Sequence, residues 1–161
     1  EWQPLEEPVG VALIRLEDRL RDHPVTVTLP PDLPLVPLDG VLIEQVFINL
    51  LENAVKYTPS GTPIEIAATA VDGAVRVDVA DRGPGLPAGE ETRIFEKFYR
   101  VPGATATSGV GLGLTIVRGI ITAHGGRIWE ENRPGGGAVF HFTLPLTGAP
   151  PLPVPAEADG A

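Results

Sequence analysis

Three polar side chains recur in one stretch of the chain at a spacing that would bring them together on a helix. Asn49, Asn53 and Lys56 fall within about 60° of arc if residues 42–59 are helical. Asparagine is a poor residue for a helix interior, because its amide competes with the backbone for hydrogen bonds. A neighbouring loop could satisfy the two amides. Alternatively, this edge presents amide oxygens and one positive charge to a polyanion or its metal.

A carboxylate followed by two glycines ends a predicted strand. Asp81 is followed by Gly83 and Gly85, which let the backbone turn sharply and approach a ligand closely. A buried carboxylate at this place needs a donor, and the exocyclic amine of a purine would serve. An ordinary acidic turn is the alternative, because turns of this composition are common.

Alternating glycines lead into a further predicted helix. Gly109, Gly111 and Gly113 match neither the G-x-x-x-x-G-K-[ST] loop nor a G-x-G-x-x-G motif that follows a strand. They nevertheless leave backbone N–H groups unpaired beside the positive end of a helix dipole, which favours an anion. A flexible hinge without a ligand is the alternative.

Hydrophobic periodicity predicts three amphipathic helices. The central one, residues 42–59, begins after the N-cap Asp39, ends at the turn 58–61, and has a broad apolar face. That face comprises Leu42, Ile43, Val46, Phe47, Leu50, Leu51 and Ala54. An earlier helix is expected between Pro4 and Leu20, packed on a sheet and regular from Pro8. The last one runs from Gly109 through about His124, with its inward side chains at Leu114, Val117, Ile120 and Ile121.

Strands account for most of the remaining chain. Alternating patterns predict them at 25–29, 63–71, 74–80, 127–131 and 138–144. The Asp72-Gly73 pair predicts a hairpin between the second and third. Residues 30–37 are expected to form a proline-rich connection, residues 90–95 a short helix, and residues 101–108 a mobile segment. This order predicts an α+β two-layer sandwich with helices on one face of a mixed sheet.

Composition limits the class of protein. The chain has 161 residues, of which 43% are hydrophobic and 20% charged, which suits one globular domain. A net charge of −9 argues against a nucleic-acid surface, and the lack of cysteine excludes disulfides. No apolar run approaches the ~20 residues that span a bilayer, and no signal peptide is visible. We expect a piece of a longer intracellular polypeptide, with a domain at 1–147 and a disordered Pro/Ala-rich tail at 148–161.

Four motifs in this order together resemble the ATP-binding domain of bacterial sensor histidine kinases. They match the N, G1, F and G2 boxes of the gyrase/Hsp90/histidine-kinase/MutL superfamily, and they read NLLENAVKYT, DRGPGL, IFEKFYR and GVGLGL. The resemblance runs from about Leu5 to Leu146 and is most detailed toward the potassium-responsive, Kdp-type sensor kinases. It implies the Bergerat ATP-binding fold, which is a mostly antiparallel mixed sheet with helices on one face and a flexible ATP lid.

The resemblance also implies roles for individual residues, with ATP and Mg²⁺ as the bound groups. Asn53 would hold Mg²⁺ on the phosphates, and Asn49 would lie close to them. Lys56 would contact phosphate, Tyr57 would lie beside the nucleoside, and Asp81 would accept from the adenine amino group. The remaining implied contacts, to the base or to the phosphates, are Gly83, Gly85, Leu86, Lys97, Arg100, Gly109, Val110, Gly111, Leu112, Gly113 and Leu114. Asn53, Lys56 and Arg100 are the implied catalytic residues.

The implied reaction is phosphoryl transfer from ATP to a histidine. The family's acceptor is a histidine followed by an acid and, a few residues later, a proline, and His23, His124 and His141 do not fit this pattern. We therefore expect ATP binding without autophosphorylation. The resemblance implies an upstream histidine-bearing dimerisation domain, a response regulator, and a membrane-attached parent whose cytoplasmic domain here contacts neither membrane nor nucleic acid.

Two other functions are compatible with this fold. One is a nucleotide-sensing module without transfer, against which the intact set of site residues argues. The other is a conformational ATPase, which would need a carboxylate one turn before Asn49, where Gln45 stands. His124, His141 and Trp129 are expected to be structural.

Overall fold

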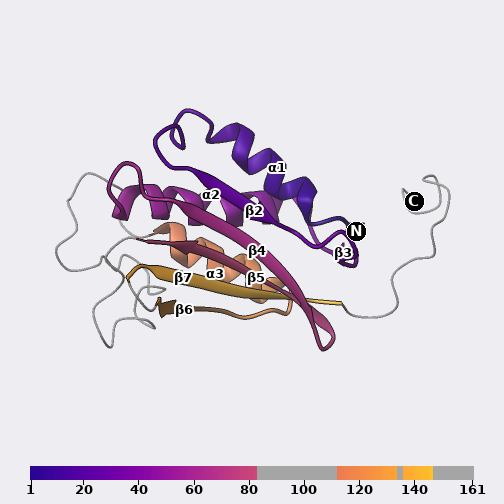
Figure 1. Cartoon of the computed structure of the whole chain (residues 1–161). Helices are drawn as coiled ribbons and strands as arrows, with labels where there is room; N and C mark the ends of the chain where they lie inside the picture. Colours follow the sequence, from indigo (N-terminus) through magenta and orange to yellow (C-terminus); the bar gives the residue numbers. More distant parts are fainter. Residues whose placement is uncertain (83–111, 134–135, 147–161) are drawn as a thin grey trace.

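A computed structural model describes residues 1–82, 112–133 and 136–146 of the chain. Within them, a five-stranded sheet in the order β2-β4-β5-β7-β6 is covered on one face by helices (Figure 1). The strands are β2 Val25–Thr28, β4 Ile64–Val71, β5 Ala74–Asp81, β6 Ile128–Asn132 and β7 Ala138–Pro145. This confirms the predicted α+β architecture. The predicted short helix 90–95, mobile segment 101–108 and tail 148–161 lie outside the described residues.

Pairing directions give the mixed sheet that the sequence predicts. β2 pairs with β4 in parallel, and the pairs β4–β5, β5–β7 and β6–β7 are antiparallel. The predicted hairpin is confirmed, because β4 and β5 flank Asp72 and Gly73, and Gly73 has φ 69°. Among the described strands, β2 lies at the edge of the sheet and has β4 as its one neighbour. Its Val27 is consequently 38% exposed rather than buried, as alternation alone would suggest.

A second, two-stranded sheet was missed. β1 (Trp2–Gln3) pairs antiparallel with β3 (Val36–Pro37), where a plain proline-rich connection was expected. Two residues are too few to show a period of two, so the sequence carries no alternation signal for either strand.

The first helix, α1 (Glu6–Arg15), is shorter than predicted. It begins before Pro8, which fits in the first turn because the N–H that proline lacks has no partner there. Leu16 ends the helix with φ −103° and ψ 15°, yet Leu16 and Leu20 still pack into the core. The apolar pattern therefore continues beyond the end of the helix. The predicted packing on the sheet is also incomplete, since α1 lies chiefly against α2.

The central helix is α2 (Gly40–Tyr57), and the Asp39 side chain caps it by accepting from the Leu42 N–H at 3.0 Å. One member of the predicted apolar face is wrong. Leu42 is 40% exposed, whereas Ile48, which was not assigned to that face, is buried. α1 and α3 flank α2, so the buried arc extends to Ile48 and leaves Leu42, in the first turn, outside it.

The third helix, α3 (Leu112–Ala123), packs on α2 and β7. Val117, Ile120 and Ile121 are buried as predicted, and Leu114 is partly buried against the same core. Phe47 of α2 meets Phe142 of β7 edge to face at 5.6 Å, which joins the helical layer to the sheet. No helix in the described part of the chain is long and apolar enough to cross a membrane.

Candidate nucleotide site

Helices α2 and α3 lie side by side and antiparallel. Asn49 Nδ2, past the middle of α2, donates to the carbonyl of Gly113 in the first turn of α3 at 3.3 Å. At the other end, His124, just after α3, accepts from the N–H of Asp39, just before α2. The N-terminus of α3 therefore faces the C-terminal half of α2. This places the predicted polar edge of α2 beside the positive end of the α3 dipole.

That polar edge is only partly engaged in contacts within the described chain. Asn49 also accepts from Gln45 Nε2 at 2.8 Å, so both ends of its amide are fixed. Asn53 is half-buried, and no hydrogen bond joins its amide to another described residue. Lys56 is exposed, with its ammonium 5.7 Å from the centroid of the Tyr57 ring. The Asn53 amide and the Lys56 ammonium thus lie one turn apart on α2.

Asp81 lies at the same end of the molecule as the C-terminus of α2. α2 ends at Tyr57 and β4 begins at Ile64, which pairs in register with Asp81, the last residue of β5. Asp81 is 9% exposed, and its Oδ1 accepts from the Ala138 N–H at 3.3 Å. A buried carboxylate whose orientation is fixed by a backbone N–H is suited to recognise one particular hydrogen-bond donor of a ligand.

The residues that hold Asp81 are not predicted by the sequence. Arg133 Nη1 donates to the Asp81 carbonyl at 3.0 Å, and Gly137 packs against that same carbonyl. Both belong to the connection between β6 and β7, which was predicted only as a loop. The signal was present as a run of glycines, of which Gly136 and Gly137 have φ of 111° and 101°, but nothing in the sequence shows that this loop meets the end of β5.

The structure therefore brings Asn49 and Gly113 together and places Asn53, Lys56 and Tyr57 on the same stretch of α2, with Asp81 at the adjoining sheet end. Leu114 follows in the first turn of α3, and Leu112 begins that helix. Predicted contacts outside the described residues remain predictions: Gly83, Gly85, Leu86, Lys97, Arg100, Gly109, Val110 and Gly111.

The residues expected to be structural make structural contacts. His124 Nδ1 lies 2.8 Å from the Ile120 carbonyl. His141 on β7 lies between Asp78 Oδ1 at 2.6 Å and Glu131 Oε1 at 2.7 Å, and it stacks on Trp129 with ring centroids 5.1 Å apart. The side chains of His141 and Trp129 lie on the sheet face opposite to the buried Phe140 and Phe142.

Comparison with known proteins supplies the family. The model for "Histidine kinase-, DNA gyrase B-, and HSP90-like ATPase" matches residues 38–148. The chain belongs to this family. It is 51% identical over 152 residues to sensor protein KdpD of Escherichia coli, and 42% identical over 150 residues to the adaptive-response sensory kinase SasA of Nostoc sp.. These matches cover 94% and 89% of the chain, but they span 17% and 37% of the relatives' lengths.

Solved structures place the chain with the histidine-kinase type. A mycobacterial sensor histidine kinase, MprB, matches with a TM-score of 0.82 and 29% identity over 90% of this chain and 97% of that one. Full-length ShkA in complex with AMPPNP matches with 0.78 and 31% over 90% and 30%. The histidine kinase ThkA in complex with the response regulator TrrA matches with 0.77 and 32% over 91% and 42%. The chain is thus an ATP-binding domain of the sensor histidine kinase type.

Proposed function

We propose that this chain binds ATP and Mg²⁺ between the C-terminal half of α2, the end of β5 and the N-terminus of α3. The observation that carries the proposal is the hydrogen bond from Asn49 Nδ2 to the Gly113 carbonyl, which holds the polar edge of α2 against the first turn of α3. Phosphates placed there would meet Lys56 on one side. On the other side they would meet first-turn N–H groups, which have no intrahelical partner.

Asp81 is the proposed adenine-recognising residue. An ionised carboxylate only accepts hydrogen bonds and has about four lone-pair sites, so Asp81 can accept from more than one donor at once, the Ala138 N–H and an adenine amino group among them. Tyr57, at the end of α2, would lie beside the nucleoside, and Leu114 would line the base pocket. The AMPPNP complex of ShkA, a protein with this fold, supports nucleotide binding by this chain.

The residues fit a magnesium ion shared with phosphate. Mg²⁺ prefers oxygen ligands and usually keeps several waters, so one amide oxygen plus phosphate oxygens suffices. The Asn53 amide is available for this, and the described residues contain no cluster of three or more His, Cys, Asp or Glu that could hold a metal alone. Bound Mg²⁺ would neutralise charge on the phosphates, while Lys56 and the α3 N-terminus position them.

We further propose that the γ-phosphoryl group passes from ATP to a histidine on a dimerisation domain outside these residues. Positioning and charge neutralisation would be the work of this domain, with Asn53, Lys56 and the predicted Arg100 as its catalytic residues. Gln45 supports a kinase over a conformational ATPase, because it stands where an ATPase needs a carboxylate and instead donates to Asn49. A nucleotide-sensing module without transfer is the alternative.

The biology of the parent protein is proposed from its relatives. The likeness to sensor protein KdpD supports potassium or osmotic-stress signalling and a parent in the cell membrane, with this domain in the cytoplasm. The ThkA–TrrA complex supports a response regulator as a downstream partner.

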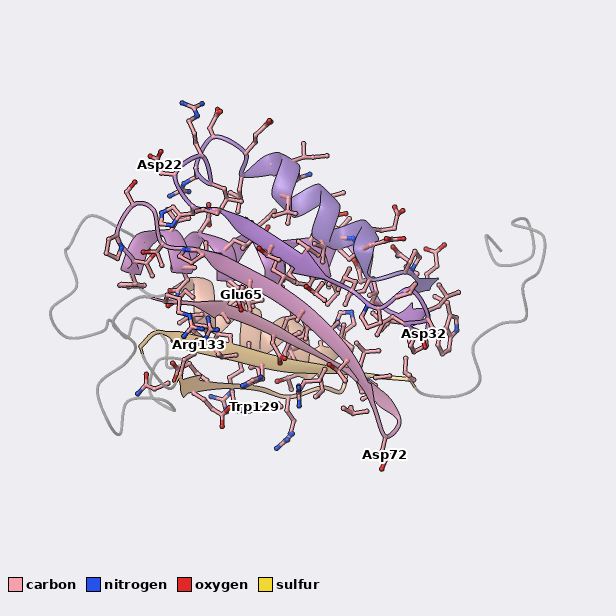
Figure 2. The ribbon with its side chains drawn as sticks, viewed as in Figure 1. Asp22, Asp32, Glu65, Asp72, Trp129 and Arg133 are labelled. Atoms are coloured by element: carbon pink, nitrogen blue, oxygen red, sulfur yellow. The ribbon has the colours of Figure 1, made fainter. Side chains whose placement is uncertain are left out.

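Calorimetric titration with ATP, with and without Mg²⁺, tests the site. Asn53→Ala is expected to remove most of the Mg²⁺ dependence, and Asp81→Asn to remove adenine selectivity. Asp72→Asn makes the same chemical change at the β4–β5 hairpin tip, far from the site, and should bind like the unaltered chain (Figure 2). Equal affinity in all variants would contradict the residue assignments.

Transfer needs a separate test. The chain would be mixed with a purified histidine-bearing hairpin from a sensor kinase of the KdpD type and γ-labelled ATP. Label on the hairpin supports the kinase, whereas ATP binding without label on the hairpin favours the sensing module.

A further inference from the structure

The β5–β7 ladder ends in an unusual way next to the proposed adenine-recognising residue. Regular pairing stops at Ala80 and Val139. One step further, the Ala138 N–H donates to the Asp81 side chain at Oδ1 instead of to a strand carbonyl. The carboxylate thus takes the place of a backbone acceptor, and the Asp81 carbonyl needs another partner.

Arg133 supplies that partner from two strands away. Because β7 lies between β5 and β6, the side chain that follows β6 reaches past β7 to the Asp81 carbonyl, to which Nη1 donates at 3.0 Å. Its Nη2 lies 3.3 Å from Glu65 Oε1 on β4. Figure 2 shows the labelled Arg133 and Glu65 close together at this end of the sheet. The Arg133 side chain is 14% exposed and that of Glu65 is 47% exposed, so the contact with the Asp81 carbonyl is better shielded from solvent than the contact with Glu65.

The loop that carries Arg133 is itself fixed on Asp81. The Arg133 N–H donates to the Gly137 carbonyl at 2.8 Å, which closes the loop. Gly137 has φ 101°, and a Cβ on it would collide with the Asp81 carbonyl oxygen. The peptide group that follows Asp81 is therefore held from two sides, which also fixes the direction of the Asp81 Cα–Cβ bond.

We propose that Arg133, braced by Glu65, is a positioning residue that sets the selectivity of Asp81 for adenine over a 6-oxo purine. The inference rests on the proposed function of Asp81. Adenine presents an amino donor to the carboxylate, whereas hypoxanthine carries an oxygen acceptor on the same ring carbon, C6. A fixed carboxylate discriminates between them. A carboxylate free to turn away loses attraction for adenine and loses repulsion toward hypoxanthine.

The test measures the Kd of ATP and of ITP for the 161-residue chain and four variants by calorimetry. Arg133→Ala is expected to raise the Kd of ATP about fivefold, the worth of roughly one hydrogen bond, and to leave ITP within about twofold. Arg133→Lys keeps the positive charge but loses the forked guanidinium. Its Kd for ATP should therefore lie between those of the unaltered chain and Arg133→Ala. Glu65→Gln should lower the ATP preference by about twofold because it weakens the brace.

The matched control, and the fourth variant, is Arg127→Ala on the same edge of the sheet. Arg127 lies over the Trp129 ring at 5.0 Å, away from Asp81, so the ratio of the two Kd values should not change. The ratio of the Kd values for ITP and ATP is the decisive measurement, since a general loosening of the fold would weaken the binding of both nucleotides together.

An unchanged ratio in Arg133→Ala, or an equal loss for both nucleotides, would overturn the inference. If thermal melting shows that Arg133→Ala does not fold, Arg133→Lys and Glu65→Gln decide, and unaltered ratios in both would overturn it. Lack of ATP binding by the unaltered chain would instead overturn the proposed function, so the two failures can be told apart.

Discussion

His124, just after α3, accepts a hydrogen bond at Nε2 from the backbone N–H of Asp39, the N-cap of α2, over 3.1 Å. Its Nδ1 lies 2.8 Å from the Ile120 carbonyl, so Nδ1 carries the hydrogen in this arrangement. One imidazole thus fastens the two helices at the end opposite to Asn49 and Gly113. The end of the helix pair at which we propose nucleotide binding is therefore held by a different contact from the end at His124.

Replacing His124 should destabilise the fold without changing the site. His124→Ala removes both ring contacts, and we expect the free energy of unfolding to fall by about 1–2 kcal/mol. Urea unfolding followed by circular dichroism measures this. Arg118→Ala, at an exposed position of α3, should change the free energy of unfolding by less than about 0.5 kcal/mol. A similar effect of both variants would contradict the role of the imidazole.

Gly137 and Gly119 offer a matched pair of glycines. Gly137→Ala forces a Cβ into the Asp81 carbonyl at a φ of 101°, so a loss of about 2–4 kcal/mol in unfolding free energy is expected, together with weaker ATP binding. Gly119 lies in α3 with nothing within 4 Å of the position that a Cβ would take, and Gly119→Ala should stabilise by about 0.5–1 kcal/mol. Thermal melting of both variants gives the comparison, and tolerance of Ala at 137 would contradict the packing described.

The Asn49 side chain should be sensitive to charge. Asn49→Asp cannot donate to the Gly113 carbonyl and places a negative charge beside the proposed phosphates. ATP affinity should therefore drop at least about tenfold, and more than in Asn49→Ala, which removes the contact without adding charge. Calorimetry at low and high salt separates the loss of the hydrogen bond from the effect of the added charge. Screening by salt should narrow the difference in ATP affinity between the two variants. A larger loss in Asn49→Ala than in Asn49→Asp would argue against phosphates at this place.

The outer sheet face should contribute stability and leave ATP binding unaffected. His141 contacts Asp78 and Glu131, whose side chains are 20% and 63% exposed. Double-mutant cycles with His141→Ala should give a coupling of about 1 kcal/mol to Asp78 and a smaller one to Glu131, because exposed pairs are weaker. The Kd of ATP should stay within about twofold of the unaltered chain. The opposite order of couplings would show that burial does not govern this cluster.

Local patterns predicted those features that depend on neighbours in sequence. The Asp39 cap, the Asp72-Gly73 hairpin and the buried face of α3 are each determined within a few residues. The predicted end of α1 was wrong, because Leu16 and Leu20 stay in the core after the helix has ended at Arg15. The support of Asp81 by Arg133 depends on β7 lying between β5 and β6, and strand order across a sheet leaves no periodic trace in the chain.

Both tryptophans of the chain lie away from the proposed nucleotide position. Trp129, labelled in Figure 2, stacks on His141 on the sheet face opposite to the buried Phe140 and Phe142. Trp2 lies in β1, near the start of α2 rather than its end. Intrinsic fluorescence therefore reports on the integrity of the sheet and on the chain's first residues, and it should barely respond to ligand. The same optical signal can therefore follow denaturation at any ATP concentration, and a denaturation midpoint that rises with ATP would report binding through its effect on stability.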